Sequence, residues 1–331
     1  MIGVGLIGYG LGGAAFHAPA ISGEPRLRLE AVVTSRGGQV ERDHPGVRVV
    51  GSAGELLDDP AVELVVVAAP NAVHHDLTAA ALRAGRHMVV DKPFALSTAD
   101  ADDLIDLAAA TDRRLSVFHN RRWDGDFLTV RRCAESGVLG ELATFVSRYD
   151  RFRPAPKGGW KEEAVPGSGI LWDLGPHLID QAMVLFGPPR TVWADLGVQR
   201  PEVEAVDYVH LVLGYGRLRA VLHAGMLVRD PGPRFELHGD QGSLVTRGLD
   251  RPEVDATLTY EVGGLELRGR LAGATTAYGT FYAQMAAAVA GEGPVPVAPG
   301  DARAAVAVIE HALASARDGR VVEVAGPAPA G

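Results

Sequence analysis

The stretch that decides the fold is IGVGLIGYGLGGAA, residues 2–15. Its first six residues are an apolar run that predicts a buried strand, and the alanines at its end predict a helix. Between them, Gly8, Gly10 and Gly13 have the spacing G-x-G-x-x-G. Gly8 permits a sharp turn, Gly10 leaves room for a pyrophosphate beside the backbone, and Gly13 lets the helix pack on the strand. With Leu11, they predict a dinucleotide-binding turn; a glycine-rich turn without a ligand is the alternative.

Strands and helices alternate from this turn to residue 118. Each strand is a short apolar run, and each intervening segment has helical periodicity or a helix cap. Further strands are predicted at 26–34, 64–69, 87–90 and 115–118. This alternation is typical of a doubly wound parallel sheet, so residues 1–118 are predicted to form an α/β Rossmann domain that binds NAD(P).

From residue 119 onward the pattern changes to longer alternating strands with few helices. Residues 207–213 and 217–223 are predicted to form a hairpin joined by Gly214-Tyr215-Gly216. Residues 119–331 are therefore predicted to form an α+β domain with an antiparallel or mixed sheet. Strands with one polar face can pair subunits, so we expect a homo-oligomer. The tail at 326–331 is expected to be disordered.

Composition excludes several classes of function. Lys plus Arg is 32 and Asp plus Glu is 41, which gives a net charge of −9 and argues against a nucleic-acid partner. Cys133 is the single cysteine, so no intrachain disulfide can form and a cytoplasmic location is expected. We expect no membrane segment, because no apolar run reaches spanning length. The histidines are scattered, so no metal site is expected.

The end of the second predicted strand indicates the cofactor. An NAD-binding unit has an acidic residue here, which binds the ribose 2′-hydroxyl. This chain instead has Thr34, Ser35 and Arg36, with no acid until Glu41. Arginine pairs with a phosphate and hydroxyls donate to it, so we predict NADP, with NAD as the alternative. The alternative is that Arg36 is an ordinary solvated arginine.

Candidate nicotinamide contacts follow the next two central strands. Pro70 and Asn71 break one strand at its carboxyl end, where open α/β sheets bind ligands, and His74 opens the helix that follows. Helix capping is the alternative for these polar residues. Lys92 follows the next strand, in Asp91-Lys92-Pro93.

An acid and a histidine begin a predicted helix in the second half. Asp173 and His177 are four residues apart, and Pro176 suits the first helical turn. Side chains at this spacing point the same way, and a carboxylate can orient an imidazole for acid–base chemistry. On spacing alone, however, an ordinary surface pair is the better interpretation.

Together these motifs resemble the glucose–fructose oxidoreductase, inositol dehydrogenase and MocA (Gfo/Idh/MocA) family. The likeness spans nearly the whole chain and is closest to NADP-dependent scyllo-inositol dehydrogenases. It rests on Gly8-x-Gly10-x-x-Gly13, Pro70-Asn71-x-x-His74, Asp91-Lys92-Pro93, Asp173-x-x-x-His177, Phe16-His17-Ala18-Pro19 and residues 119–126. The family more often has Glu-Lys-Pro where this chain has Asp91-Lys92-Pro93.

The resemblance implies a large open sheet in the second domain, which binds substrate and pairs subunits into a dimer or tetramer. It also implies that Lys92, Asp173 and His177 are the catalytic group of an NAD(P)-dependent dehydrogenase acting on a secondary alcohol of a cyclitol or sugar. Lys92 would bind the reacting oxygen and the cofactor, His177 would accept the proton, and Asp173 would orient His177 or bind a hydroxyl. The expected substrate contacts are Asn120, Arg122, Trp123, Trp160, Asp173, His177 and Tyr278. For Trp160, loop packing is an equal interpretation.

Two other functions remain open. A regulator of the same fold could sense NAD(P) without turnover, but it should have lost the lysine or the histidine. A reductase of the same fold could act on another substrate. The polar character of Asn120, Arg122 and Asp173 argues against a flat apolar substrate such as a tetrapyrrole.

Overall fold

The computed structural model describes residues 1–248 and 253–324, which form two compact units. The first unit contains residues 1–120 and 278–306, and the second contains 121–277 and the chain from 307 onward. The return of 278–306 to the first unit is not expected from the sequence-based boundary after residue 118. The tail at 326–331 lies outside the described residues.

The first unit is built on a parallel sheet of six strands in the order β3-β2-β1-β4-β5-β6. The strands are β1 (Ile2–Ile7), β2 (Leu27–Val33), β3 (Arg48–Val50), β4 (Leu64–Val67), β5 (His87–Asp91) and β6 (Leu115–Phe118). The chain turns one way from β1 to β3 and the other way from β4 to β6. The carboxyl end of β1 is thus the switch point at which such sheets bind ligands. The predicted Rossmann fold is confirmed.

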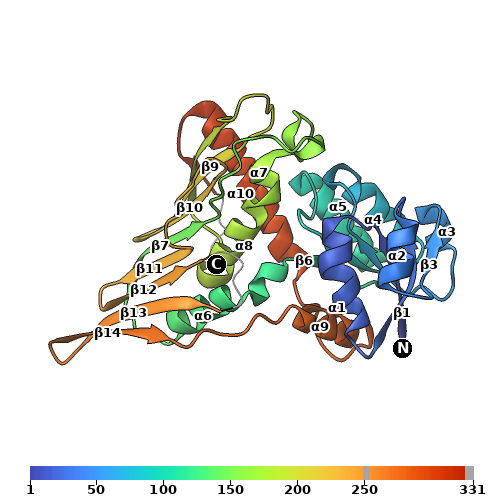
Figure 1. Ribbon diagram of the computed structural model, residues 1–331, viewed down its shortest axis with the longest axis horizontal. Coiled ribbons are helices and arrows are strands. Elements are labelled where there is room, and N and C mark those ends of the chain that lie inside the picture. The colour runs from blue at the N-terminus through green and yellow to red at the C-terminus, as the bar shows by residue number, and fades with distance from the viewer. Residues whose placement is uncertain (249–252, 325–331) are drawn as a thin grey trace, which may run out of the picture. The chain divides into compact units, whose positions relative to one another are not determined.

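Helices cover this sheet and bury its valine-rich strands. They are α1 (Ala18–Ser22), α2 (Gly37–Asp43), α3 (Ala53–Leu57), α4 (His74–Arg83), α5 (Thr98–Ala110) and α9 (Gly279–Val289). Short turns precede two of them, namely the π-helical η1 (Gly13–His17) and the 3-10 helix η2 (Asn71–Val73). The predicted cap of α5 is confirmed, because Ser97 Oγ accepts the Asp100 N–H at 3.0 Å. In the first unit, α9 lies beside α1 (Figure 1).

The second unit is built on a nine-stranded sheet in the order β14-β13-β12-β11-β7-β10-β9-β8-β15. β7 and β10 are parallel, and the other neighbours are antiparallel. The strands are β7 (Leu142–Arg148), β8 (Thr191–Gly197), β9 (Tyr208–Tyr215), β10 (Leu218–Gly225), β11 (Phe235–Gly239), β12 (Gly242–Arg247), β13 (Asp255–Val262), β14 (Leu265–Leu271) and β15 (Val322–Glu323). The predicted mostly antiparallel sheet is confirmed.

Two helices lie along one side of this sheet, α6 and α8 (Figure 1). The helical segments are η3 (Asn120–Trp123), α6 (Gly125–Glu135), η4 (Trp160–Glu162), α7 (Gly169–Asp173), α8 (Gly175–Phe186) and α10 (Pro299–Asp318), which runs through both units. The predicted hairpin forms, but its turn is wrong. Tyr215 pairs with Leu218, so Gly214 and Tyr215 belong to β9 and the turn consists of Gly216 and Arg217.

Candidate functional site

The glycine turn joins β1 to the helix as the spacing predicts. Gly8 has a φ of 102°, in the region that only glycine adopts easily, and a Cβ there would lie 2.4 Å from Ala68 O. A Cβ on Gly13 would lie 2.1 Å from Gly8 O, so the helix packs directly on the turn. A Cβ on Gly10 would meet nothing within 4 Å. The open space beside Gly10 is what the spacing predicts for a pyrophosphate against the backbone.

The segment after β2 presents polar groups to solvent. Ser35 and Arg36 are exposed, and Thr34 is half-buried. Thr34 Oγ1 accepts the Arg36 N–H at 3.0 Å, which folds the segment into a tight turn. No carboxylate lies between the end of β2 and Glu41, so the predicted preference for NADP stays a prediction that this segment allows.

His74 lies beneath the ends of β4 and β5. Its ring is 1% exposed, and its Nδ1 and Nε2 lie 2.8 Å from Pro93 O and 3.0 Å from Ala69 O. Burial lowers the pKa of His74, and hydrogen bonding to Pro93 opposes that shift. A neutral imidazole carries one N–H, so the ring donates to one of these two carbonyls. His74 ties the segment after β4 to the segment that carries Lys92. Pro70 is exposed and Asn71 is half-buried, so they remain candidates for cofactor contact.

Lys92 leaves β5 at the carboxyl edge of the sheet. Its N–H donates to Asp91 Oδ1 at 2.8 Å, and its side chain is half-buried. Asn120 is buried just beyond β6. Tyr278 precedes α9, and its ring contacts Phe16 edge-on at 6.1 Å between ring centres. Lys92 therefore follows directly on β5, a strand whose central residues are buried.

His177 belongs to the second unit and lies in the first turn of α8. Its side chain is 7% exposed, and its ring centre is 6.5 Å from that of Tyr149. The predicted single helix around Asp173 and His177 is wrong, because α7 ends at Asp173 and α8 begins at Gly175. The intervening Leu174 donates to Ile170 O and accepts from His177 N–H.

Two of the predicted substrate contacts have strong partners within the second unit. Asp173 Oδ1 accepts from Lys161 Nζ at 2.8 Å. Arg122 makes a two-pronged ion pair with Asp180, with its Nε and Nη2 2.9 and 2.7 Å from the two oxygens. Arg122 therefore fixes η3 against α8 through Asp180, which follows His177 by three residues. Trp123 and Trp160 are half-buried, with the Trp160 ring 5.7 Å from Lys161 Nζ.

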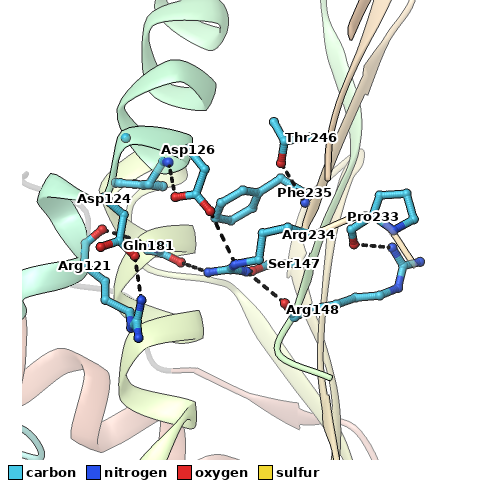
Figure 2. Close-up of polar contacts among 12 residues, drawn as sticks. Arg121, Asp124, Asp126, Ser147, Arg148, Gln181, Pro233, Arg234, Phe235 and Thr246 are labelled. Atoms are coloured by element: carbon cyan, nitrogen blue, oxygen red, sulfur yellow. Dashed lines mark hydrogen bonds and ion pairs between the residues drawn. The ribbon is translucent and has the colours of Figure 1, made fainter. Parts of the chain in front are cut away.

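Sequence reasoning missed a buried network around Arg234, which Figure 2 shows. Arg234 Nη2 donates to Gln181 Oε1 at 2.9 Å, and its Nη1 donates to Ser147 Oγ at 2.5 Å. Its Nε lies 3.8 Å from Asp126 Oδ2. Burial raises the pKa of Asp126, and Arg234 opposes that shift. The network anchors α8 and α6 to β7 and β11.

Tyr149 connects this network to His177. The guanidinium groups of Arg121 and Arg234 lie 4.8 and 4.5 Å from the centre of its ring. Alternation along 144–151 could have placed Tyr149 on the buried face, but nothing local indicates that Arg121 and Arg234 lie over its ring. The guanidinium of the nearby Arg151 is farther from the ring centre, at 5.6 Å. Because His177 packs beside Tyr149, the arginines help to fix the wall against which the imidazole rests.

The Arg122–Asp180 pair gives a stability prediction. Asp180→Ala leaves a largely buried guanidinium without its carboxylate, so we expect the free energy of unfolding to fall by about 3 kcal/mol. Denaturant unfolding measures this change. The matched control is Glu135→Ala, which breaks the exposed Arg131–Glu135 pair and should cost less than about 1 kcal/mol. Equal effects of the two substitutions would contradict a buried role for Asp180.

Comparison with known proteins identifies both units. Residues 2–119 match the model described as the oxidoreductase family, NAD-binding Rossmann fold, and residues 127–245 match the GFO/IDH/MocA C-terminal domain. The chain belongs to the Gfo/Idh/MocA family of oxidoreductases. The expected family, and with it the expected NAD(P)-linked oxidoreductase, is confirmed.

Relatives and solved structures of this family cover nearly the whole chain. The Escherichia coli oxidoreductase YdgJ is 41% identical, and the alignment covers 95% of this chain and 96% of YdgJ. The Bacillus subtilis scyllo-inositol 2-dehydrogenase (NADP(+)) IolW is 36% identical, over 96% and 95% of the two chains. The structure of the B. subtilis oxidoreductase yvaA has a TM-score of 0.94 and 34% identity, over 98% of each chain. In the described part of this chain, no helix is both long and apolar enough to cross a membrane.

Proposed function

We propose that this family member is an NADP-dependent dehydrogenase that oxidises a secondary alcohol of a cyclitol or sugar. The observation that carries the proposal is Lys92, held at the carboxyl edge of a sheet whose glycine turn fits a dinucleotide. The relative IolW, named for NADP and scyllo-inositol, supports the cofactor and substrate class.

In the proposed oxidation, the bound cofactor accepts the hydride and the side chains of the chain handle the proton and the charge. The nicotinamide, when bound, supplies the hydride acceptor. The Lys92 ammonium donates to the reacting oxygen and stabilises the negative charge that develops on it, and it also holds the cofactor. His177 accepts the hydroxyl proton, because an imidazole titrates near neutral pH. Asp173 orients His177 or binds a neighbouring hydroxyl.

The other proposed contacts bind and orient. Gly8, Gly10, Leu11 and Gly13 hold the pyrophosphate, and Thr34, Ser35 and Arg36 hold the 2′-phosphate. Pro70, Asn71 and His74 face the nicotinamide, and His74 also ties the segment that carries Lys92. The proposed substrate contacts are Asn120, Trp123, Trp160 and Tyr278, with Arg122 acting through Asp180.

Self-association and location complete the proposal. We propose that copies pair through the face of the nine-stranded sheet opposite α6 and α8, giving a dimer or tetramer. That face carries half-buried rings, among them Trp193, His210 and His223. The lone Cys133, which is buried, suits the reducing cytoplasm.

A substrate screen tests the proposal. Purified protein is mixed with a panel of cyclitols and sugars and either NADP or NAD, and reduction is followed by nicotinamide absorbance. Turnover of at least one polyol with NADP is expected. Cofactor binding without any turnover would favour the regulator, and turnover confined to another class of carbonyl or imine substrate would favour the alternative reductase.

Arg36→Asp tests the choice of cofactor. The substitution removes a phosphate partner and adds a repelling charge, so the KM for NADP should rise about tenfold to a hundredfold, while that for NAD stays or falls. Steady-state kinetics with each cofactor measure the change. Arg83→Asp is the control, because it makes the same charge change at an exposed position on α4. Unchanged constants for both cofactors would remove Arg36 from the site.

A further inference from the structure

His17 is a buried histidine that the proposed chemistry does not use. It ends the π-helical turn directly after the glycine turn, and its side chain is 0% exposed. Its ring packs on Phe118 with 4.1 Å between ring centres. π-helical turns frequently mark functional positions, because the wider turn redirects one side chain.

Tyr282 of α9 forms a hydrogen bond with the His17 ring. The Tyr282 hydroxyl lies 2.6 Å from His17 Nδ1, and both side chains are fully buried. Burial raises the pKa of Tyr282 well above 10, so its phenol keeps its proton. A phenol that donates to Nδ1 leaves the imidazole N–H on Nε2. The segment that returns to the first unit thus sets which nitrogen of His17 can donate.

Asp91 lies in front of that nitrogen. Its Oδ2 is 3.8 Å from His17 Nε2, and its Oδ1 accepts the N–H of Lys92 at 2.8 Å. A Cβ on Gly12 would come within 2.8 Å of Oδ2, so the carboxylate rests against the glycine turn. Burial acts to raise the pKa of Asp91, but His17 and Lys92 outweigh it, with smaller help from His74, and lower the pKa. The group is therefore a carboxylate.

We propose that His17, supported by Tyr282, is a positioning residue that holds Asp91 and thereby fixes the direction in which Lys92 leaves β5. The inference rests on the catalytic role proposed for Lys92. The His17 Nε2 lies 3.8 Å from one oxygen of Asp91, within the range of an electrostatic contact, and the other oxygen accepts the backbone N–H of Lys92. A rotation of the Asp91 side chain would break its hydrogen bond with the Lys92 N–H. The Lys92 ammonium would then no longer point at the reacting oxygen.

Three variants of the full-length protein test this chain of contacts. His17→Leu removes both nitrogens, His17→Gln keeps a donor that can reach Asp91, and Tyr282→Phe removes one oxygen. We expect His17→Leu to lower kcat about tenfold to a hundredfold, because small misplacements of a catalytic group have effects of this size. The Kd for NADPH, measured by fluorescence, should change less than about threefold. His17→Gln should recover most of the lost kcat.

Coupling between the two residues is the second measurement. Tyr282→Phe should lower kcat in the wild-type background but not in the His17→Leu background, because Tyr282 acts only through His17. His75→Gln is the control, since this histidine is on the same unit but lies half-buried beside Asp76 and Asp103. It should leave kcat and the Kd unchanged.

The outcomes separate this inference from the proposed function. The inference alone is overturned if folded Tyr282→Phe and His17→Leu keep the wild-type kcat while Lys92→Met is inactive. It is also overturned if His17→Gln is as impaired as His17→Leu, since that result indicates packing rather than a polar contact with Asp91. Should His17→Leu fail to fold, Tyr282→Phe and His17→Gln still decide. If Lys92→Met keeps its turnover, the proposed function fails and this inference with it.

Discussion

His177→Ala should lower kcat by about a hundredfold to ten-thousandfold, because a positioned general base contributes a factor of this size. The imidazole is nearly buried in the first turn of α8 and rests beside the ring of Tyr149. Alanine at this position removes the proposed proton acceptor but leaves the glycine turn of the other unit intact. The Kd for NADPH should therefore be unchanged. Single-turnover measurement of nicotinamide reduction gives the rate of the chemical step directly.

His238→Ala provides the matched control for this prediction. His238 also belongs to the second unit, but it is partly exposed on β11 and its Nδ1 bonds to Ser243 Oγ at 2.8 Å. It should have wild-type kcat. A His177→Ala variant with normal turnover would remove His177 from the mechanism, and a variant that also loses NADPH binding would show that the substitution had disturbed the fold.

The first unit was predictable because its signals are local. The apolar run before Gly8 and the valine run of β4 each fill a buried strand, and Ser97 caps α5 as its spacing with Asp100 predicts. The short strand β3 of the first unit and the strands β8, β14 and β15 of the second were missed. Every residue of β14 before Leu271 is exposed, so no apolar alternation marks it.

Other errors arose where distant residues decide. The break at Leu174 divides what spacing alone presents as one helix. The pairing of Arg122 with Asp180 joins residues 58 positions apart, and that of Arg234 with Gln181 joins residues 53 apart. The contacts of the His74 ring with Pro93 O and Ala69 O are likewise not indicated by the motif, and its contact with the cofactor stays a prediction. A motif gives residue types and order, whereas these roles depend on the contacts that the fold creates.

Lys92→Met should lower kcat by about a hundredfold to a thousandfold, because it removes a charged donor from an oxygen that becomes negative during the reaction. Methionine keeps the length of the side chain and leaves the backbone bond to Asp91 in place. Stopped-flow measurement of hydride transfer gives the loss. Lys157→Met serves as the control at a position outside the proposed site. The Kd for NADPH separates the two roles proposed for Lys92, because only a lysine that also holds the cofactor changes it.

Combining Lys92→Met with His177→Ala asks whether the two residues act on one bond. If Lys92 stabilises the oxygen from which His177 takes the proton, each group is useful only while the other is present. The double variant should then be about as slow as the slower single variant, as is typical of residues that act as a unit. If the two losses multiply, Lys92 and His177 serve separate steps, and the shared-oxygen mechanism is excluded. The measurement needs no assumption about the substrate beyond its turnover, so it tests the mechanism independently of which polyol is oxidised.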